Sequence, residues 1–162
     1  MFKKGKPLKK PDDVDHAYDY ALFLLNLSMR TERELREKMT TRGYFPEIID
    51  ATVVKLYEDR YLDDAHYAEV FIESMKRYKY YGSCIKKKKL YEKKVPKEII
   101  EEKLSELLSV EDEREIATRY VEKNFGVLAE VTKLDYDEKQ KIMRRLMSRG
   151  FNLDVAKSLV GN

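Results

Sequence analysis

Cysteine is nearly absent from this chain, because Cys84 is the only one among 162 residues. A single cysteine cannot close an intrachain disulfide, so we expect the protein in a reducing compartment, the cytoplasm. Glycine and proline are scarce, with 6 and 4 residues, and tryptophan is missing. Charged residues make up 39% of the chain, against about 25% in average globular proteins. This composition predicts helices that expose much of their surface.

Long apolar runs and the patterns of catalytic chemistry are missing too. The longest apolar stretch, residues 21–27, is far shorter than a membrane span, and the acidic segment before it argues against a signal peptide. His16 and His66 are isolated in the sequence, and His66, close to Asp63 and Asp64, is expected at the surface or a helix cap. No Cys/His metal spacing and no glycine-rich phosphate loop occurs. We therefore expect a soluble protein that is not an enzyme and binds no cofactor or metal.

What the chain does contain is a unit that occurs three times. Residues 40–57, 91–108 and 147–160 superpose, with apolar residues at the helical spacing i, i+4, i+7 and i+8, although the third copy ends earlier. Two further amphipathic segments precede each copy, so each unit has three helices and a length of about 45–50 residues, a period typical of helical arrays. This predicts an all-α protein, an elongated tandem array of three three-helix (helix-turn-helix-like) repeats. The expected boundaries are a basic flexible tail over 1–14 and repeats over 15–62, 63–110 and 111–162.

Local signals at the helix ends agree with this division. Thr31 and Glu34 have the spacing of a capping box. Gly43 and Gly150 follow the second helix of their repeats, where a left-handed residue commonly ends a helix. Lys94 stands at the matching position of the middle repeat. Either Lys94 tolerates the left-handed backbone or the turn differs there.

Residues 76–94 form a strongly basic stretch, with nine lysine or arginine residues, four tyrosines and a single acid, Glu92. The lysines surround most of the helix, so some of their stems must lie against the core. One interpretation is a solvated helix whose lysines extend to water. The other is a nucleic-acid contact, in which cations neutralise phosphates and rings stack on bases, without reading sequence. The lack of nearby acids favours the nucleic acid, although packing between repeats is as good a role for Tyr78 and Tyr91.

The residues of the middle repeat resemble the RecX family of bacterial recombination regulators, and the resemblance extends over residues 15–160. The residues that carry it are Tyr61, Leu62, Asp63, Asp64, Ala68, Phe71, Ser74, Arg77 and Gly82. The flanking residues 28–44 and 141–151 resemble the first and third repeats of that family. Two positions depart from its pattern: Lys86 replaces an aliphatic residue, as found at Leu35 and Ile142, and Lys94 replaces glycine.

The resemblance implies a monomeric, non-enzymatic protein that binds in the groove of the RecA–DNA filament. It implies restraint of strand exchange, ATP hydrolysis and coprotease activity, in homologous recombination, DNA repair and the SOS response. Single- and double-stranded DNA would be contacted without sequence specificity. The alternative is a helix-turn-helix-like DNA-binding protein that acts without RecA. The candidate DNA or filament contacts are Lys76, Arg77, Lys79, Tyr81, Lys86, Lys87, Lys88, Lys89, Lys93, Lys94, Arg144 and Arg145.

Overall fold

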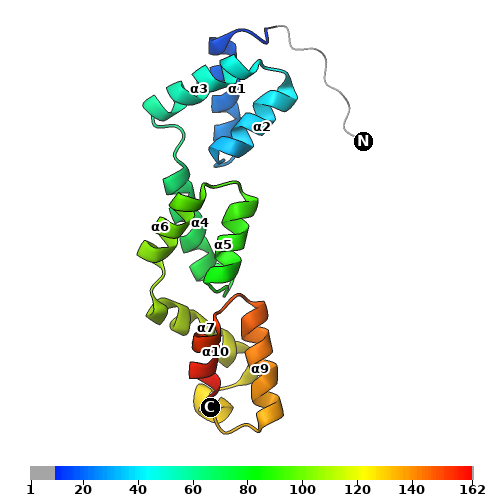
Figure 1. Cartoon of the computed structure of the whole chain (residues 1–162), viewed down its shortest axis with the longest axis vertical. Coiled ribbons are helices and arrows are strands. Elements are labelled where there is room, and N and C mark those ends of the chain that lie inside the picture. Colours follow the sequence, from blue (N-terminus) through cyan, green and yellow to red (C-terminus); the bar gives the residue numbers. More distant parts are fainter. Residues whose placement is uncertain (1–9, 162) are drawn as a thin grey trace. The chain divides into compact units, whose positions relative to one another are not determined.

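The computed structural model describes residues 10–161, apart from the side chain of Tyr78, and every regular element in that range is a helix (Figure 1). The all-α prediction is therefore confirmed. The helices are α1 (Val14–Leu27), α2 (Glu32–Arg42), α3 (Pro46–Glu58), α4 (Asp64–Tyr78), α5 (Ser83–Glu92), α6 (Lys97–Leu107), α7 (Val110–Phe125), α8 (Leu128–Val131), α9 (Tyr136–Ser148) and α10 (Leu153–Val160).

Contacts divide the chain into two compact units. The first unit comprises Met1–Tyr67 and Lys93–Pro96, and the second comprises Ala68–Glu92 and Lys97–Asn162. The division passes through α4 and through the turn between α5 and α6. Of the predicted N-terminal tail, residues 1–9 lie outside the described residues, whereas the carbonyl of Pro11 accepts a hydrogen bond from the amide of Phe45 at 3.2 Å.

The first unit is built on a core that α1, α2 and α3 share. Leu35, Met39 and Leu56 are fully buried in it. The predicted capping box at the start of α2 is confirmed, since Thr31 and Glu34 each bond the other's backbone amide. Gly43 ends α2 in the left-handed conformation, with φ of 105°. The cap and the glycine turn thus fix both ends of α2 against the core.

The second unit contains a core formed by α7, α8, α9 and α10. Ile116, Leu146, Phe151 and Leu159 are buried there. The short helix α8 contributes Val131, which is also buried, so the segment between α7 and α9 is part of this core. The apolar face of one short helix buries little area, so the core of this unit combines the apolar faces of four helices.

The turn after the second helix contains a residue with positive φ in all three copies. Gly43, Lys94 and Gly150 have positive φ angles of 105°, 65° and 84°. Lys94 therefore tolerates the left-handed conformation, at a cost of about 1–2 kcal/mol for a residue with a side chain.

The turn after α5 contacts the start of α2, and the turn after α9 contacts the start of α5. In the first unit, the hydroxyl of Thr31 donates to the carbonyl of Lys93 at 2.8 Å. In the second unit, the amide of Gly82 donates to the carbonyl of Arg149 at 3.0 Å, and that of Cys84 to the carbonyl of Gly150 at 3.1 Å. The second set of bonds holds the loop between α4 and α5, which carries two of the predicted contact residues, Lys79 and Tyr81.

Candidate nucleic-acid interface

Lys86 is not on the surface, although it belongs to the predicted contact residues. Its side chain is fully buried in α5, at the position that Leu35 and Ile142 fill in the other repeats. The Nζ atom donates to the carbonyl of Tyr81 at 2.6 Å. Burial lowers the pKa of Lys86 to about 8, although the negative charge of Glu113 opposes this shift. With no exposed surface, Lys86 cannot contact a polyanion, so its prediction as a contact residue is wrong.

Three further cations of the set are paired with acids. Lys76 lies 3.3 Å from Glu73 and 3.5 Å from Asp112, and it donates to the carbonyl of Leu107 at 2.9 Å. The contacts with Leu107 and Asp112 join α4 to the end of α6 and the start of α7. Lys76 is thereby a structural residue within the second unit.

Lys87 and Lys93 also have acidic partners. Lys87 pairs with Glu101 of α6 at 3.0 Å, and Lys93 pairs with Glu34 of α2 at 3.0 Å. Both hydrogen bonds raise the pKa of the lysine concerned. The expectation that these lysines lack compensating acids is thus wrong, because the acids come from other helices.

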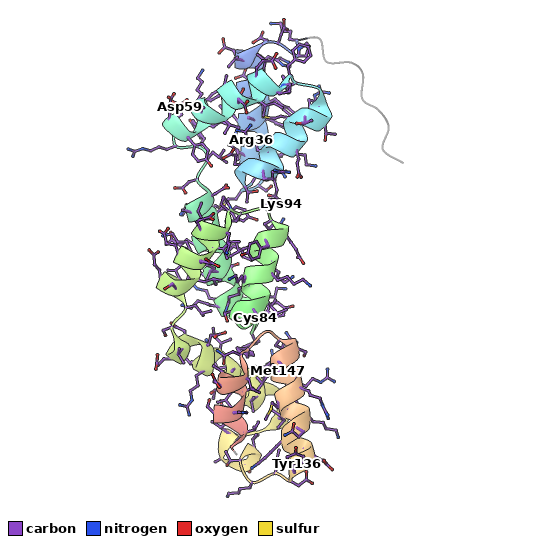
Figure 2. All side chains as sticks on the ribbon, in the orientation of Figure 1. Arg36, Asp59, Cys84, Lys94, Tyr136 and Met147 are labelled. Atoms are coloured by element: carbon purple, nitrogen blue, oxygen red, sulfur yellow. The ribbon has the colours of Figure 1, made fainter. Side chains whose placement is uncertain are left out.

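The remaining cations of the set form no ion pair among the described residues. They are Arg77, Lys79, Lys88, Lys89, Lys94, Arg144 and Arg145. All of them are exposed except Lys89, which is half-buried. Cys84, labelled in Figure 2, lies in the first turn of α5, and Lys94 follows two residues after the helix ends at Glu92. Positive charge without a partner is therefore available on α5, at the end of α4 and on α9.

Lys79, Tyr81 and Lys89 come together at one hollow of about 320 Å³ in the second unit. The other lining residues are Phe71, Ser74 and Met75 of α4. The hollow combines two unpaired ammonium groups with an aromatic ring. Cations and rings side by side are the usual means of binding a nucleic-acid strand.

Arg149 holds the ring of Tyr81 from the third repeat. Its guanidinium lies 5.4 Å from the centroid of the Tyr81 ring and 4.9 Å from that of Tyr120, and it donates to the carbonyl of Lys79 at 3.3 Å. Sequence reasoning did not place Arg149 at this site. The only signal was the recurrence of a cation before the left-handed residue, at Arg42, Lys93 and Arg149.

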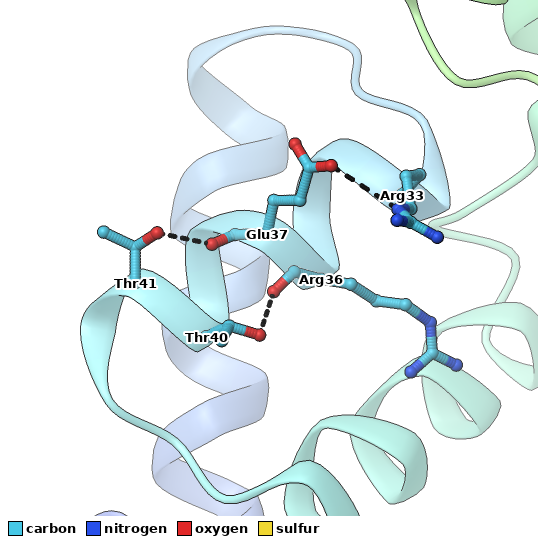
Figure 3. Close-up of a pocket in the computed structure, with 5 residues that line it drawn as sticks. All are labelled: Arg33, Arg36, Glu37, Thr40 and Thr41. Carbon is cyan, nitrogen blue, oxygen red and sulfur yellow. Dashed lines mark hydrogen bonds and ion pairs between the residues drawn. The ribbon is translucent and has the colours of Figure 1, made fainter.

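A second hollow, on α2, is lined by residues that satisfy one another (Figure 3). Arg33 lies 3.4 Å from Glu37, and Arg36 pairs with Glu32 and Asp50. The hydroxyls of Thr40 and Thr41 donate to backbone carbonyls one turn earlier. Because its charges are neutralised locally, this hollow is a poor candidate for an anion.

Neither a metal site nor a membrane span is found within residues 10–161. No group of three or more His, Cys, Asp or Glu side chains in that range could hold a metal ion. No helix in the described part of the chain is both long and apolar enough to cross a membrane. His66 is exposed in the first turn of α4, where Asp63 accepts a hydrogen bond from its amide at 2.9 Å. The surface position that its acidic neighbours predict is thus confirmed.

Comparison with known proteins gives three matches in order along the chain. The models of the first, second and third three-helix domains of RecX match residues 17–56, 63–104 and 111–160. The chain is 34% identical to the regulatory protein RecX of Finegoldia magna, over 90% of this chain and 70% of that protein. It is 33% identical to the regulatory protein RecX of Clostridium perfringens, over 96% and 72%.

Solved structures agree in fold. The crystal structure of RecX from Lactobacillus salivarius superposes with a TM-score of 0.82 at 24% identity, and the match covers 92% of this chain and 95% of that one. A second crystal structure of a regulatory protein RecX gives a TM-score of 0.76 at 22% identity, over 98% and 80%.

Proposed function

Because this chain belongs to the RecX family, whose members are named regulatory proteins rather than enzymes, we propose that it regulates the RecA recombinase. It acts mainly as an inhibitor, binding as a monomer in the groove of the RecA–DNA filament. There it restrains strand exchange, ATP hydrolysis and coprotease activity during DNA repair and the SOS response. The observation that carries the proposal is the match of all three domain models in their order.

The DNA part of this proposal is supported by the cations that the fold leaves without partners. Lys79, Lys88, Lys89 and Lys94 are placed on or beside α5 and form no ion pair among residues 10–161. Because ammonium groups bind phosphates and do not read base edges, the contact is independent of DNA sequence. Arg77, Arg144 and Arg145 are proposed as further contacts.

The charge of α6, the third helix of the middle repeat, argues against the RecA-independent alternative. In three-helix DNA-binding domains the third helix enters the major groove, beside two rows of phosphates. Helix α6 carries Glu98, Glu101, Glu102 and Glu106, against two lysines. A helix with this charge would be repelled from the groove, so we favour the filament as the partner.

The test is a titration of the protein into RecA that hydrolyses ATP on single-stranded DNA. We expect inhibition at less than one molecule of this protein per RecA. A variant with Lys88→Glu and Lys89→Glu should inhibit less well. The matched control combines Lys38→Glu and Lys133→Glu, which makes the same charge change at two exposed residues outside α5.

Two results would count against the proposal. If RecA hydrolyses ATP at an unchanged rate at every ratio of the two proteins, regulation of RecA is wrong. If the control weakens inhibition as much as the α5 variant does, the basic surface is not the contact.

A further inference from the structure

The ring of Tyr81 is fixed in place by the residues around it. Its own carbonyl accepts the hydrogen bond from the buried Lys86, and Arg149 lies against its ring. The carbonyl of Lys79, two residues earlier, accepts from the same guanidinium. Tyr80, between them, adopts the left-handed conformation with φ of 47°, which is unfavourable for a residue with a side chain. A loop held in this way loses little further freedom when a ligand binds.

The hollow beside this ring has an apolar floor and a cationic rim. Phe71 and Met75 of α4 line it, and the hydroxyl of Ser74 donates to the carbonyl of Phe71 at 2.8 Å within the helix. Lys79 and Lys89 supply the rim, and the Nζ atom of Lys89 lies 5.7 Å from the centroid of the Tyr81 ring. At about 320 Å³ the volume is at the lower end of the range for small-molecule sites. One nucleotide is a ligand of suitable size and charge.

We propose that this hollow holds one unpaired base of single-stranded DNA against the Tyr81 ring, with the neighbouring phosphates on Lys79 and Lys89. The inference rests on the proposed function and adds which form of DNA the basic surface prefers. The base takes the place of the Lys89 ammonium over the ring. That ammonium is the end of a flexible chain without an ion pair among the described residues, so it can turn to a phosphate.

Single-stranded DNA fits the hollow better than duplex DNA for a steric reason. A base in a duplex is stacked on both faces and paired at its edge, so it reaches a hollow only after leaving the helix. An unpaired base offers its face at once, and every base has such a face. The Ser74 proton is engaged within α4, and the other lining side chains are apolar, aromatic or cationic. Little discrimination between bases is therefore expected.

The test measures binding of a labelled oligothymidine by fluorescence anisotropy, without RecA, over a series of salt concentrations. Tyr81→Ala should weaken binding between about 5-fold and about 150-fold, the range found when stacking rings are truncated. Tyr81→Phe, which keeps the ring, should bind as the unmodified protein does. The matched control is Tyr91→Ala, because Tyr91 is a partly exposed ring on α5 that does not line the hollow.

The salt dependence separates the ring from the cations. Lys89→Gln should reduce the slope of log K against log salt by about 0.7, the value for one phosphate contact on a single strand. Tyr81→Ala should leave that slope unchanged, and Lys133→Gln should change neither slope nor affinity. Circular dichroism checks that each variant is folded. If Tyr81→Ala fails to fold, Tyr81→Leu removes the aromatic face and keeps apolar bulk.

Several results would overturn the inference. They are no measurable binding by the unmodified protein, equal losses for Tyr81→Ala and Tyr91→Ala, or an equal loss for Tyr81→Ala on duplex DNA. The ATPase titration separates this failure from that of the proposed function. If the unmodified protein inhibits RecA but Tyr81→Ala binds DNA normally, only the assignment of the hollow as a base-binding site is wrong. If Tyr81→Ala loses strand binding but the unmodified protein does not inhibit RecA, base binding in the hollow is supported and regulation of RecA is wrong.

Discussion

Replacing Lys86 by methionine should change how the stability of the protein depends on pH. Lys86 is fully buried, its Nζ atom is bonded to the Tyr81 carbonyl, and its pKa is lowered to about 8. The charged groups that act on it are Glu113, Lys76, Asp112 and Glu73. The three acids favour the proton on Lys86, but their attraction is smaller than the effect of burial. The folded protein therefore binds this proton more weakly than the unfolded chain does.

The sign and size of the effect follow from this difference. The ordinary value of 10.5 and the value of about 8 differ by about 2.5 pH units, which corresponds to about 3 kcal/mol. Below pH 8 both states hold the proton, and the folded state is destabilised by the full amount. As the pH rises from about 8 to about 10.5, the folded state releases the proton first, so its free energy of unfolding increases. Between about pH 7 and about pH 9.5 the increase is about 2 kcal/mol.

The assay is urea unfolding of both proteins, followed by circular dichroism, across this pH range. Methionine has a similar length and no charge, so the Lys86→Met protein lacks the increase. Relative to the Lys86→Met variant, the free energy of unfolding of the unmodified protein should rise by about 2 kcal/mol, or about 1 M urea in midpoint at a slope of about 2 kcal/mol per M. Taking the difference cancels other groups, such as Tyr67, whose burial raises its pKa. A difference that stays constant with pH would show that the Lys86 ammonium is solvated.

Two predictions concern the loops and caps. Gly82→Ala should destabilise the second unit by about 3 kcal/mol in thermal unfolding, because a β-carbon there would collide with the backbone of Gly150; a loss below 1 kcal/mol would contradict the close approach. Thr31→Val should cost about 2 kcal/mol, since the buried hydroxyl accepts from Glu34 and donates to Lys93. Thr52→Val is its control and should not destabilise, because the buried Thr52 hydroxyl has no hydrogen-bond partner among the described residues.

The fold could be predicted from the sequence because the same local pattern occurs three times. Apolar spacing alone is ambiguous for a short segment, but three aligned copies with a cap before and a turn after leave few alternatives. Lys94 shows how strongly the repeat determines the backbone of this turn. The turn keeps its left-handed backbone although a lysine replaces glycine, because the contacts of the repeat outweigh a local cost of about 1–2 kcal/mol.

The candidate site was only partly predictable, because charge pairing depends on residues that are distant in the sequence. Lys87 meets Glu101, and Lys93 meets Glu34, across 14 and 59 positions. A count of acids within the basic stretch could not find these partners. The alignment did indicate that Lys86 takes a core position, but not that its ammonium would bond the carbonyl of Tyr81.

The contact of Thr31 with Lys93 and the contact of Gly82 with Arg149 differ in a way that explains why the hollow arises in the second unit. Thr31 and Gly82 are equivalent positions, and each donates to the carbonyl of the cation before a left-handed residue, Lys93 or Arg149. Thr31 uses its side chain, whereas Gly82 uses its backbone amide. The missing β-carbon lets the two backbones approach directly.

The cations at these equivalent turns consequently have different roles. In the first unit, Lys93 is neutralised by Glu34. In the second, Arg149 lies over the Tyr81 ring and forms no ion pair among the described residues, so it adds positive charge beside Lys79 and Lys89. The same repeat geometry thus produces an internal ion pair in one unit and an unneutralised, ring-lined hollow in the other. A binding site for a polyanion is expected only where the charge remains unpaired.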